Sequence, residues 1–231
     1  MTTEMGIRTG LDKDSIILAS DLSRTSSSWE ARGDTAFRQQ TKSEGRKIYV
    51  DDKERFAICM SGVFDQHYVD FLSALLKGKI NVKKATEKGY FPELMDLNNR
   101  RWDGRFPDGD YINGLLIATR FNNKPKLFTC WPLGRVEERA WTAIGSGSEY
   151  AIKHIGKQDK LIPGYLSQEE GIKLAIASLD EASQDIYTGG LDLVVVDKAG
   201  IVPFSGLIKN NFNDARDKSE SDILKILKKR N

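Results

Sequence analysis

The stretch Ser15-Ile-Ile-Leu-Ala-Ser-Asp21 lies near the start of a 231-residue chain and is the first clear indication of its fold. It is too short and too rich in β-branched side chains for a helix, so residues 15–20 are predicted to form a strand. An acidic residue directly after a strand is commonly a simple cap, and Asp21 is open to that interpretation. A second interpretation of Asp21 depends on Thr2, before this stretch, and on Lys47, after it.

Several other short apolar runs follow the same pattern, and some come in pairs joined by turn residues such as Asn122-Asn123-Lys124-Pro125. Further strands are predicted at residues 47–50, 55–62, 114–119, 126–131, 140–144, 191–196 and 200–204. Hairpin-linked strands of this kind favour antiparallel sheets.

Helical patterns lie between the groups of strands. Asp65 is predicted to cap a helix that stops at Gly78, and Ser148 to cap a second helix. The strongest start signal is Ser167-Gln-Glu-Glu170, a capping box. A short helix is also expected over residues 222–227. Two sheets between layers of helices would accommodate this order of elements.

The chain length is typical of one large domain, and we expect a single domain over residues 1–231. No linker or internal repeat interrupts the sequence. Residues 24–46 are rich in Ser, Thr, Gln and charged side chains, and residues 87–111 in Gly, Asn, Arg and Asp. Both segments are predicted to be irregular, loop-like insertions.

The composition is that of an ordinary globular protein, with 39% hydrophobic and 29% charged residues. The 35 basic and 33 acidic side chains leave a net charge of +2, which gives no reason to expect a nucleic acid or an anionic membrane as partner. No apolar run reaches the roughly 18 residues that span a bilayer, and no secretory signal is visible. We therefore expect a cytoplasmic protein.

The cysteine and histidine content gives no sign of a metal or cofactor site. Cys59 and Cys130 each lie in an apolar run and are expected to be buried thiols in a reducing compartment rather than a disulfide. His67 and His154 lie on predicted helices without a companion ligand pattern, so solvated or packed histidines are the favoured interpretation. We expect no cofactor and no metal.

The first residues of the chain raise the question of chemistry. Methionine before a small residue is usually removed, which would leave Thr2 with a free α-amine beside its own hydroxyl. An α-amine has a pKa of about 7.7–8.0, so it can act as the base that a hydroxyl nucleophile needs. The plainer interpretation is a disordered leader.

Other candidate residues lie at the ends of predicted strands. Lys47 would usually be solvated, but held by an aspartate near Thr2 it would lower the pKa of the nucleophile. Gly62 is either a plain turn glycine or the donor of an oxyanion-binding N–H. The turn Gly145-Ser-Gly-Ser148 could cradle an anion at the start of a helix, but it lacks the spacing of nucleotide-binding loops and of the hydrolase elbow.

Taken in order, these blocks resemble the proteasome β-subunit family of N-terminal-threonine hydrolases, including its simpler bacterial relatives of the HslV and Anbu types. The matching blocks are Thr2–Ile7, Ile17–Asp21, Gly45–Val50, Ser61-Gly62, Ile144–Ser148, Asp185–Gly190 and Asp192–Val196. The resemblance implies an α+β fold, the four-layer αββα sandwich of N-terminal nucleophile hydrolases. The stretch between Asp21 and Lys47 is longer than is usual in the family, and we expect removal of Met1 alone, without a propeptide, to expose Thr2.

The resemblance also implies a role for each matched residue. Thr2 would be the nucleophile with its own amine as base, Asp21 and Lys47 the charge pair that tunes it, and Gly62 the source of the oxyanion-hole N–H. The residues implied to orient the terminus are Ser146, Asp185 and Thr188. Threonine at position 188 replaces the serine that is usual in the family and keeps the hydroxyl.

Four residues are implied on the substrate side: Thr25, Tyr49, Met60 and Phe64. The last three are apolar, so we expect a preference for apolar or small side chains before the cleaved bond. The expected function is a threonine peptidase of a self-compartmentalising ring that acts on peptides or unfolded proteins. An ATPase or another regulator is a further candidate partner. Two alternatives remain: a non-catalytic ring or scaffold subunit, and a substrate-specific amidase or transpeptidase with an N-terminal nucleophile.

Overall fold

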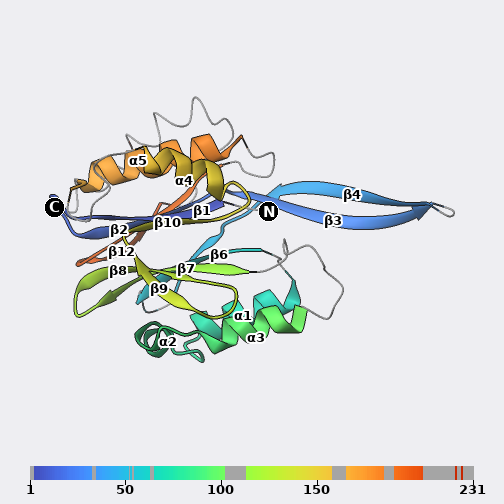
Figure 1. Ribbon diagram of the computed structural model, residues 1–231, viewed down its shortest axis with the longest axis horizontal. Coiled ribbons are helices and arrows are strands. Elements are labelled where there is room, and N and C mark those ends of the chain that lie inside the picture. Colours follow the sequence, from blue (N-terminus) through green and yellow to red (C-terminus); the bar gives the residue numbers. More distant parts are fainter. Residues whose placement is uncertain are drawn as a thin grey trace.

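The computed structural model describes residues 3–32, 35–51, 53, 55–62, 65–101, 113–157, 165–184, 190–204, 222 and 225, with the backbone alone for residues 23–44 and 101. Within these residues the chain forms two five-stranded antiparallel sheets and a separate two-stranded ribbon. Figure 1 shows the two sheets stacked face to face with helices on both outer sides. The expected four-layer αββα sandwich, the fold of N-terminal nucleophile hydrolases, is confirmed.

The first sheet is buried on both faces. Its strands, in spatial order, are β10 (Trp141–Gly145), β1 (Thr3–Thr9), β2 (Ser15–Ser20), β11 (Asp192–Asp197) and β12 (Gly200–Pro203). The helices α4 (Ser148–Gly156) and α5 (Gln168–Ala182) cover its outer face. Every residue of β2 is buried, because helices pack on one face and the second sheet on the other. This explains why β2 is a continuous apolar run and not an alternating one.

The second sheet has the order β5 (Ile48–Val50), β6 (Phe56–Ser61), β7 (Gly114–Phe121), β8 (Lys124–Cys130) and β9 (Val136–Arg139). Its outer face is covered by α1 (Gln66–Leu76), α2 (Val82–Lys88) and α3 (Pro92–Arg101). The predicted turn between β7 and β8 is confirmed but is tighter than expected, since Lys124 and Pro125 already belong to β8. Asn122 and Asn123, with φ of 53° and 60°, form the turn itself, as the tight two-residue hairpin loops require.

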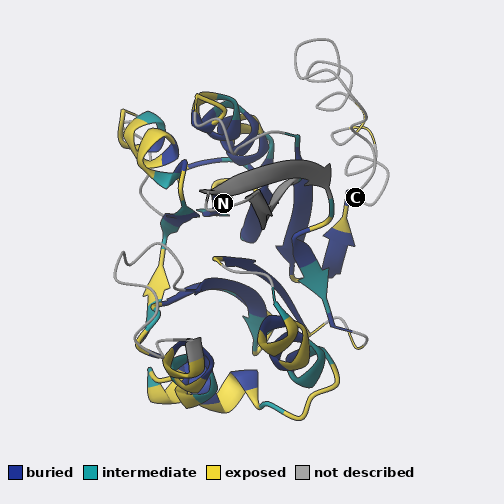
Figure 2. Cartoon of the chain, turned by 90° about the vertical axis from the view of Figure 1, so that its right-hand side faces the viewer, coloured by how far each residue is buried: buried dark blue, intermediate teal, exposed yellow. Residues whose placement is uncertain are grey.

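Three apolar layers hold the sandwich together. One lies between the first sheet and α4–α5, one between the second sheet and α1–α3, and one between the two sheets. Figure 2 shows buried strands in the middle of the molecule and helices whose outer faces are exposed. The layer between the sheets contains Leu18 and Val194 from the first sheet and Cys59 and Leu116 from the second.

The predicted helix signals are mostly confirmed. The Asp65 carboxylate accepts a hydrogen bond from the Tyr68 N–H at 2.9 Å, and Gly78 follows α1 with φ of +69°. The capping box at the start of α5 is present with both of its bonds. Ser148 was predicted to cap α4, but it is the first helical residue; Gly147 occupies the cap position because the turn after β10 keeps Gly147 outside helical geometry.

Three apolar side chains on α1 and α4 are exposed. Val69, Tyr150 and Ile152 are each about two-fifths exposed. In α1, Phe71 is buried instead of Val69 and packs into the apolar layer between the second sheet and α1–α3. The spacing rule places apolar residues within a stripe about 100° wide, and side chains at the edge of that stripe reach the surface.

The prediction of irregular insertions was wrong for much of both segments. Residues 24–46 contain most of a hairpin, β3 (Ser23–Arg32) and β4 (Thr35–Glu44), which projects from the sandwich as a two-stranded ribbon (Figure 1). Its polar composition resembles a loop, yet its cross-strand ladder satisfies the backbone polar groups. Part of the segment 87–111 forms α3, anchored by the buried Leu94 and Leu97. Residues 102–112 lie outside the described residues.

Two further expectations can be compared only in part. Of the predicted terminal helix over residues 222–227, Asp222 and Lys225 are described, and both are helical. No helix in the described part of the chain is long and apolar enough to cross a membrane.

Candidate active site

Asp21 fastens the beginning of β1 to the end of β2. Its backbone N–H donates to the Thr3 carbonyl at 3.0 Å, and its carboxylate Oδ1 accepts from the Thr3 N–H at 2.7 Å. The Ser20 hydroxyl donates to the Asp21 carbonyl at 3.0 Å. Asp21 is fully buried. The residue directly after Thr2 is therefore held on both of its backbone polar groups, which a frayed leader would not be.

Lys47 completes this arrangement from the second sheet. Its ammonium Nζ lies 2.9 Å from both carboxylate oxygens of Asp21, and the lysine is 7% exposed. The two residues are 26 positions apart, and β5, which begins directly after Lys47, brings the lysine under the first sheet. A fixed positive charge close to the start of β1 would lower the pKa of a nucleophile placed there.

Two of the predicted turns directly follow β10 of the first sheet and β6 of the second. Thr3 pairs with Gly145 of β10, so Ser146 follows directly at the edge of the first sheet, where it is exposed. Gly62 follows the last residue of β6 and has φ of +118°, a conformation that favours glycine. A side chain at Gly62 would also come within 2.8 Å of Asn113. Both observations require glycine at position 62.

Asn98, which the sequence did not single out, holds Asn113, the residue before β7 that lies against Gly62. From α3 its side-chain oxygen accepts from the Asn113 N–H at 2.9 Å, and its nitrogen donates to the Asn113 carbonyl at 3.1 Å. The same nitrogen donates to the Pro132 carbonyl at 2.9 Å. The only sequence signal for this role was an amide side chain in a segment taken for a loop.

The residues expected on the substrate side lie on several elements. Met60 is buried and Tyr49 half-buried in the apolar layer between the second sheet and α1–α3, and the Tyr49 hydroxyl donates to the Arg46 carbonyl at 3.1 Å. Thr25 is on β3, paired with Lys42, and only its backbone is described. Four expected site residues lie outside the described residues: Thr2, Phe64, Asp185 and Thr188.

Two buried carboxyl groups near Lys47 were not predicted. Glu4 on β1 and Asp192 on β11 are both fully buried. One oxygen of Asp192 accepts from the Ile48 N–H at 3.2 Å, next to Lys47 in the chain. Both residues lie inside the blocks that carry the family resemblance, but acidic side chains in a buried strand give no pattern that periodicity could detect. Among the described residues no group of histidine, cysteine, aspartate or glutamate side chains is arranged to hold a metal ion.

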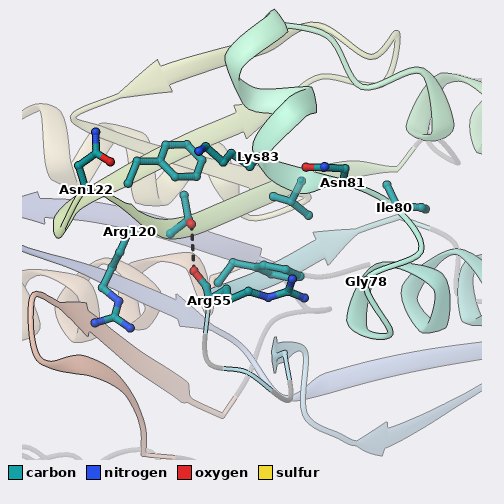
Figure 3. A pocket seen from close by; sticks show the side chains of 11 residues that line it. Arg55, Gly78, Ile80, Asn81, Lys83, Arg120 and Asn122 are labelled. Carbon is teal, nitrogen blue, oxygen red and sulfur yellow. Dashed lines mark hydrogen bonds between the residues drawn. The ribbon is translucent and has the colours of Figure 1, made fainter.

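A cavity of about 390 Å³ lies elsewhere, at the opposite end of β6 from Ser61 (Figure 3). Three cationic side chains line it, and each has a partner within the chain. Arg55 binds the Asp51 carboxylate at 2.6 Å, and Lys83 lies 3.7 Å from the Glu87 carboxylate. The Arg120 guanidinium donates to a backbone carbonyl at 3.2 Å. None of the expected site residues lines this cavity.

Comparisons with known proteins agree with the resemblance. A family model described as proteasome subunit matches residues 107–196. Proteasome subunit beta 2 of Korarchaeum cryptofilum is 32% identical over 153 residues, which cover 54% of this chain and 75% of that protein. The beta 2 subunits of Pyrococcus furiosus and Pyrobaculum calidifontis are 28% and 26% identical, over 69% and 86% of this chain and 76% and 90% of their own lengths.

Proposed function

This chain belongs to the proteasome β-subunit family, and from that membership we propose that it is a threonine peptidase whose nucleophile is Thr2. The family is one of proteasome-type peptidases. The observation that carries the finer proposal is the buried Asp21 carboxylate, which binds both the Lys47 ammonium and the Thr3 N–H. A chain end fixed in this way next to a lysine charge suits a nucleophile that must not move.

In the proposed reaction the Thr2 hydroxyl attacks the carbonyl carbon of a peptide bond. The hydroxyl proton passes to the α-amine of Thr2, which then protonates the departing amine as the peptide bond breaks. Water, deprotonated by the same amine, hydrolyses the resulting ester and releases the acid product. The Gly62 N–H stabilises the oxyanion in both halves. Ser146, Asp185 and Thr188 orient the terminus in this proposal.

Self-association and substrate choice are also proposed. Members of the family form rings, and we expect this chain to form a ring that encloses its active sites and admits peptides or unfolded proteins, with or without a separate regulator. Native mass spectrometry of the intact protein would give the number of subunits. Thr25, Tyr49, Met60 and Phe64 are proposed to shape a pocket for apolar or small side chains, which a peptide panel would test.

The decisive experiment is the intact mass of the protein before and after treatment with a peptide epoxyketone, which needs both a threonine hydroxyl and a free α-amine. A chain that lacks Met1 should gain one inhibitor mass, and Thr2→Ala should gain none. Thr3→Ala is the matched control and should still react. A correctly processed chain that gains nothing would contradict the proposal and favour a non-catalytic ring subunit. Adduct formation without hydrolysis of any peptide in the panel would favour a substrate-specific amidase or transpeptidase.

A further inference from the structure

Glu4 lies in a row of four residues that crosses the first sheet. Glu4 pairs with Ile144 on one side and with Ser20 on the other, and Ser20 pairs in turn with Asp192. Directly opposed residues of antiparallel strands point to the same face. Ile144 belongs to the apolar layer between the two sheets, as do Leu18 and Val194, two positions from Ser20 and Asp192. The whole row therefore faces the second sheet.

The second sheet presents Lys47 and Cys59 to this row. The Asp192 carboxylate accepts from the Ile48 N–H, and Ile48 pairs with Cys59 across β5 and β6. Burial raises the pKa of the Cys59 thiol, and the charges of Glu4 and Asp192 raise that pKa further while Lys47 lowers it. Glu4, Asp192 and Lys47 are thus close enough to the Cys59 sulfur to shift its pKa, and together with Asp21 they form one cluster of ionisable groups.

Hydrogen bonds are unevenly distributed in this cluster. Asp21 binds the Lys47 ammonium with both oxygens, and the Ser20 hydroxyl is engaged with the Asp21 carbonyl. Neither carboxyl oxygen of Glu4 has a hydrogen-bond partner among the described residues. A buried carboxylate without a partner is costly, so such a group takes up a proton instead. Burial raises the pKa of Glu4 well above its ordinary value; Lys47 and the chain's α-amino group lower it, and Asp21 raises it.

We propose that Glu4 is a positioning residue of the Asp21–Lys47 pair: as a neutral acid it leaves the lysine charge bound to Asp21, and its ionisation sets the upper pH limit of the site. When the Glu4 proton passes to solvent, the Lys47 ammonium faces one more carboxylate. The positive potential of the Lys47 ammonium at the start of β1 then falls, and the ammonium activates a nucleophile there less strongly. This consequence for catalysis rests on the proposed function, whereas the neutral state of Glu4 does not.

The first test is the melting temperature of the intact protein and of Glu4→Gln between pH 5 and pH 8. A group whose folded-state pKa is raised contributes stability that is complete below the ordinary carboxyl pKa and is lost as the pH rises through the folded-state pKa. Glutamine cannot ionise. Between pH 5 and pH 8 the melting temperature of the variant should therefore rise relative to that of the wild type by roughly 2–4 °C. Glu149→Gln, on the exposed surface of α4, is the matched control. A difference that stays constant with pH would overturn the proposal.

The second test asks whether Glu4 acts through Lys47. In a Lys47→Met background, the pH-dependent gain in melting temperature from Glu4→Gln should be larger. The reason is that the ammonium that lowers the pKa of Glu4 is gone. An unchanged gain would overturn the link between the two residues. The rate of epoxyketone attachment gives an independent measure if this background folds poorly. Glu4→Gln should react about threefold faster than the wild type at pH 9 and equally fast at pH 6, because only the wild type has lost the Glu4 proton at the higher pH.

The two tests separate the two ideas. Identical pH profiles of attachment for wild type and Glu4→Gln would overturn the role of Glu4 in a working site. If both chains are inert to the epoxyketone at every pH while Thr2 is correctly exposed, the proposed function fails. The melting measurements then still decide whether Glu4 is a neutral acid coupled to Lys47.

Discussion

The Asp21–Lys47 pair is the tightest charged contact near the start of β1. Both oxygens of the buried carboxylate lie 2.9 Å from Lys47 Nζ, and the Thr3 N–H adds a third bond to the same carboxylate. Such a pair contributes little net stability compared with a well-packed apolar pair, because both charges have lost their water. Its value is geometric, since it fixes a positive charge beside the residue that follows Thr2.

We expect Asp21→Asn and Lys47→Met each to reduce the free energy of unfolding by about 3–5 kcal/mol, because each leaves the other group buried without its partner. Asp21→Asn combined with Lys47→Met should cost clearly less than the sum of the two single changes. Urea denaturation of the four proteins measures this coupling. Strictly additive losses would show that the two groups do not depend on each other in the folded protein.

At the scale of single residues, the resemblance paired Asp21 with Lys47, and the two side chains are in contact in the structure. Glu4 and Asp192 were missed. A carboxyl group in a strand is a surface residue by default, and only the stacking of the second sheet over β1 and β11 makes these two buried.

At the scale of elements, α5 shows how closely the helix layer packs on the first sheet. Gly171 lies on the face of α5 toward the sheet, and a methyl group built on it would clash with the Thr9 side chain and lie 2.6 Å from the Ile17 side chain. Gly156, at the end of α4, has nothing within 4 Å of the same position. The two glycines therefore form a matched pair for measuring this packing.

Gly171→Ala should destabilise the protein by about 1–3 kcal/mol, because the overpacking exceeds the gain in helix propensity. Gly156→Ala should leave stability unchanged or raise it by up to about 1 kcal/mol, since only the propensity gain applies. Thermal or urea unfolding measures both effects. If Gly171→Ala were as harmless as Gly156→Ala, the distance between α5 and the first sheet would have to be larger than described.

The elements that the sequence predicted well are those whose local signals agree with their surroundings. β2 and β11 carry β-branched apolar runs, and α5 carries a capping box ahead of apolar residues at helical spacing. The β3–β4 ribbon was missed because its residues are polar and its stability comes from pairing between its two strands. α2 and α3 were missed for a related reason: few apolar residues anchor them, and charged residues surround those few.

At the scale of the whole molecule, the two cysteines report on different layers of the sandwich. Cys59 lies between the two sheets, and Cys130 lies between the second sheet and α1–α3. Both are buried and reduced. Burial raises the pKa of each thiol, so little thiolate is present near neutral pH. Reaction of either thiol with a labelling reagent therefore requires its layer to open.

We propose that the chain unfolds as one domain, as its length suggests. The variants Cys59→Ser and Cys130→Ser each leave one thiol to follow. The remaining thiol should react with a disulfide reagent at pH 8 only through global unfolding, with the same denaturant dependence in both variants. Labelling of Cys130 at a lower urea concentration than Cys59 would mean that the α1–α3 layer opens by itself, and the chain would then contain two cooperative units.

The sequence by itself determined most strands of the two sheets, the helices α1, α4 and α5, the four-layer class of fold, and the blocks that mark the family, because these follow from side-chain periodicity, turn residues and short contiguous motifs. The tertiary structure alone decided which charges are buried together. Glu4, Asp21, Lys47 and Asp192 come from four separate segments, and they meet because the first sheet stacks on the second. The electrostatic state of a carboxyl group depends on distance and on loss of water, and neither is written in its neighbours along the chain.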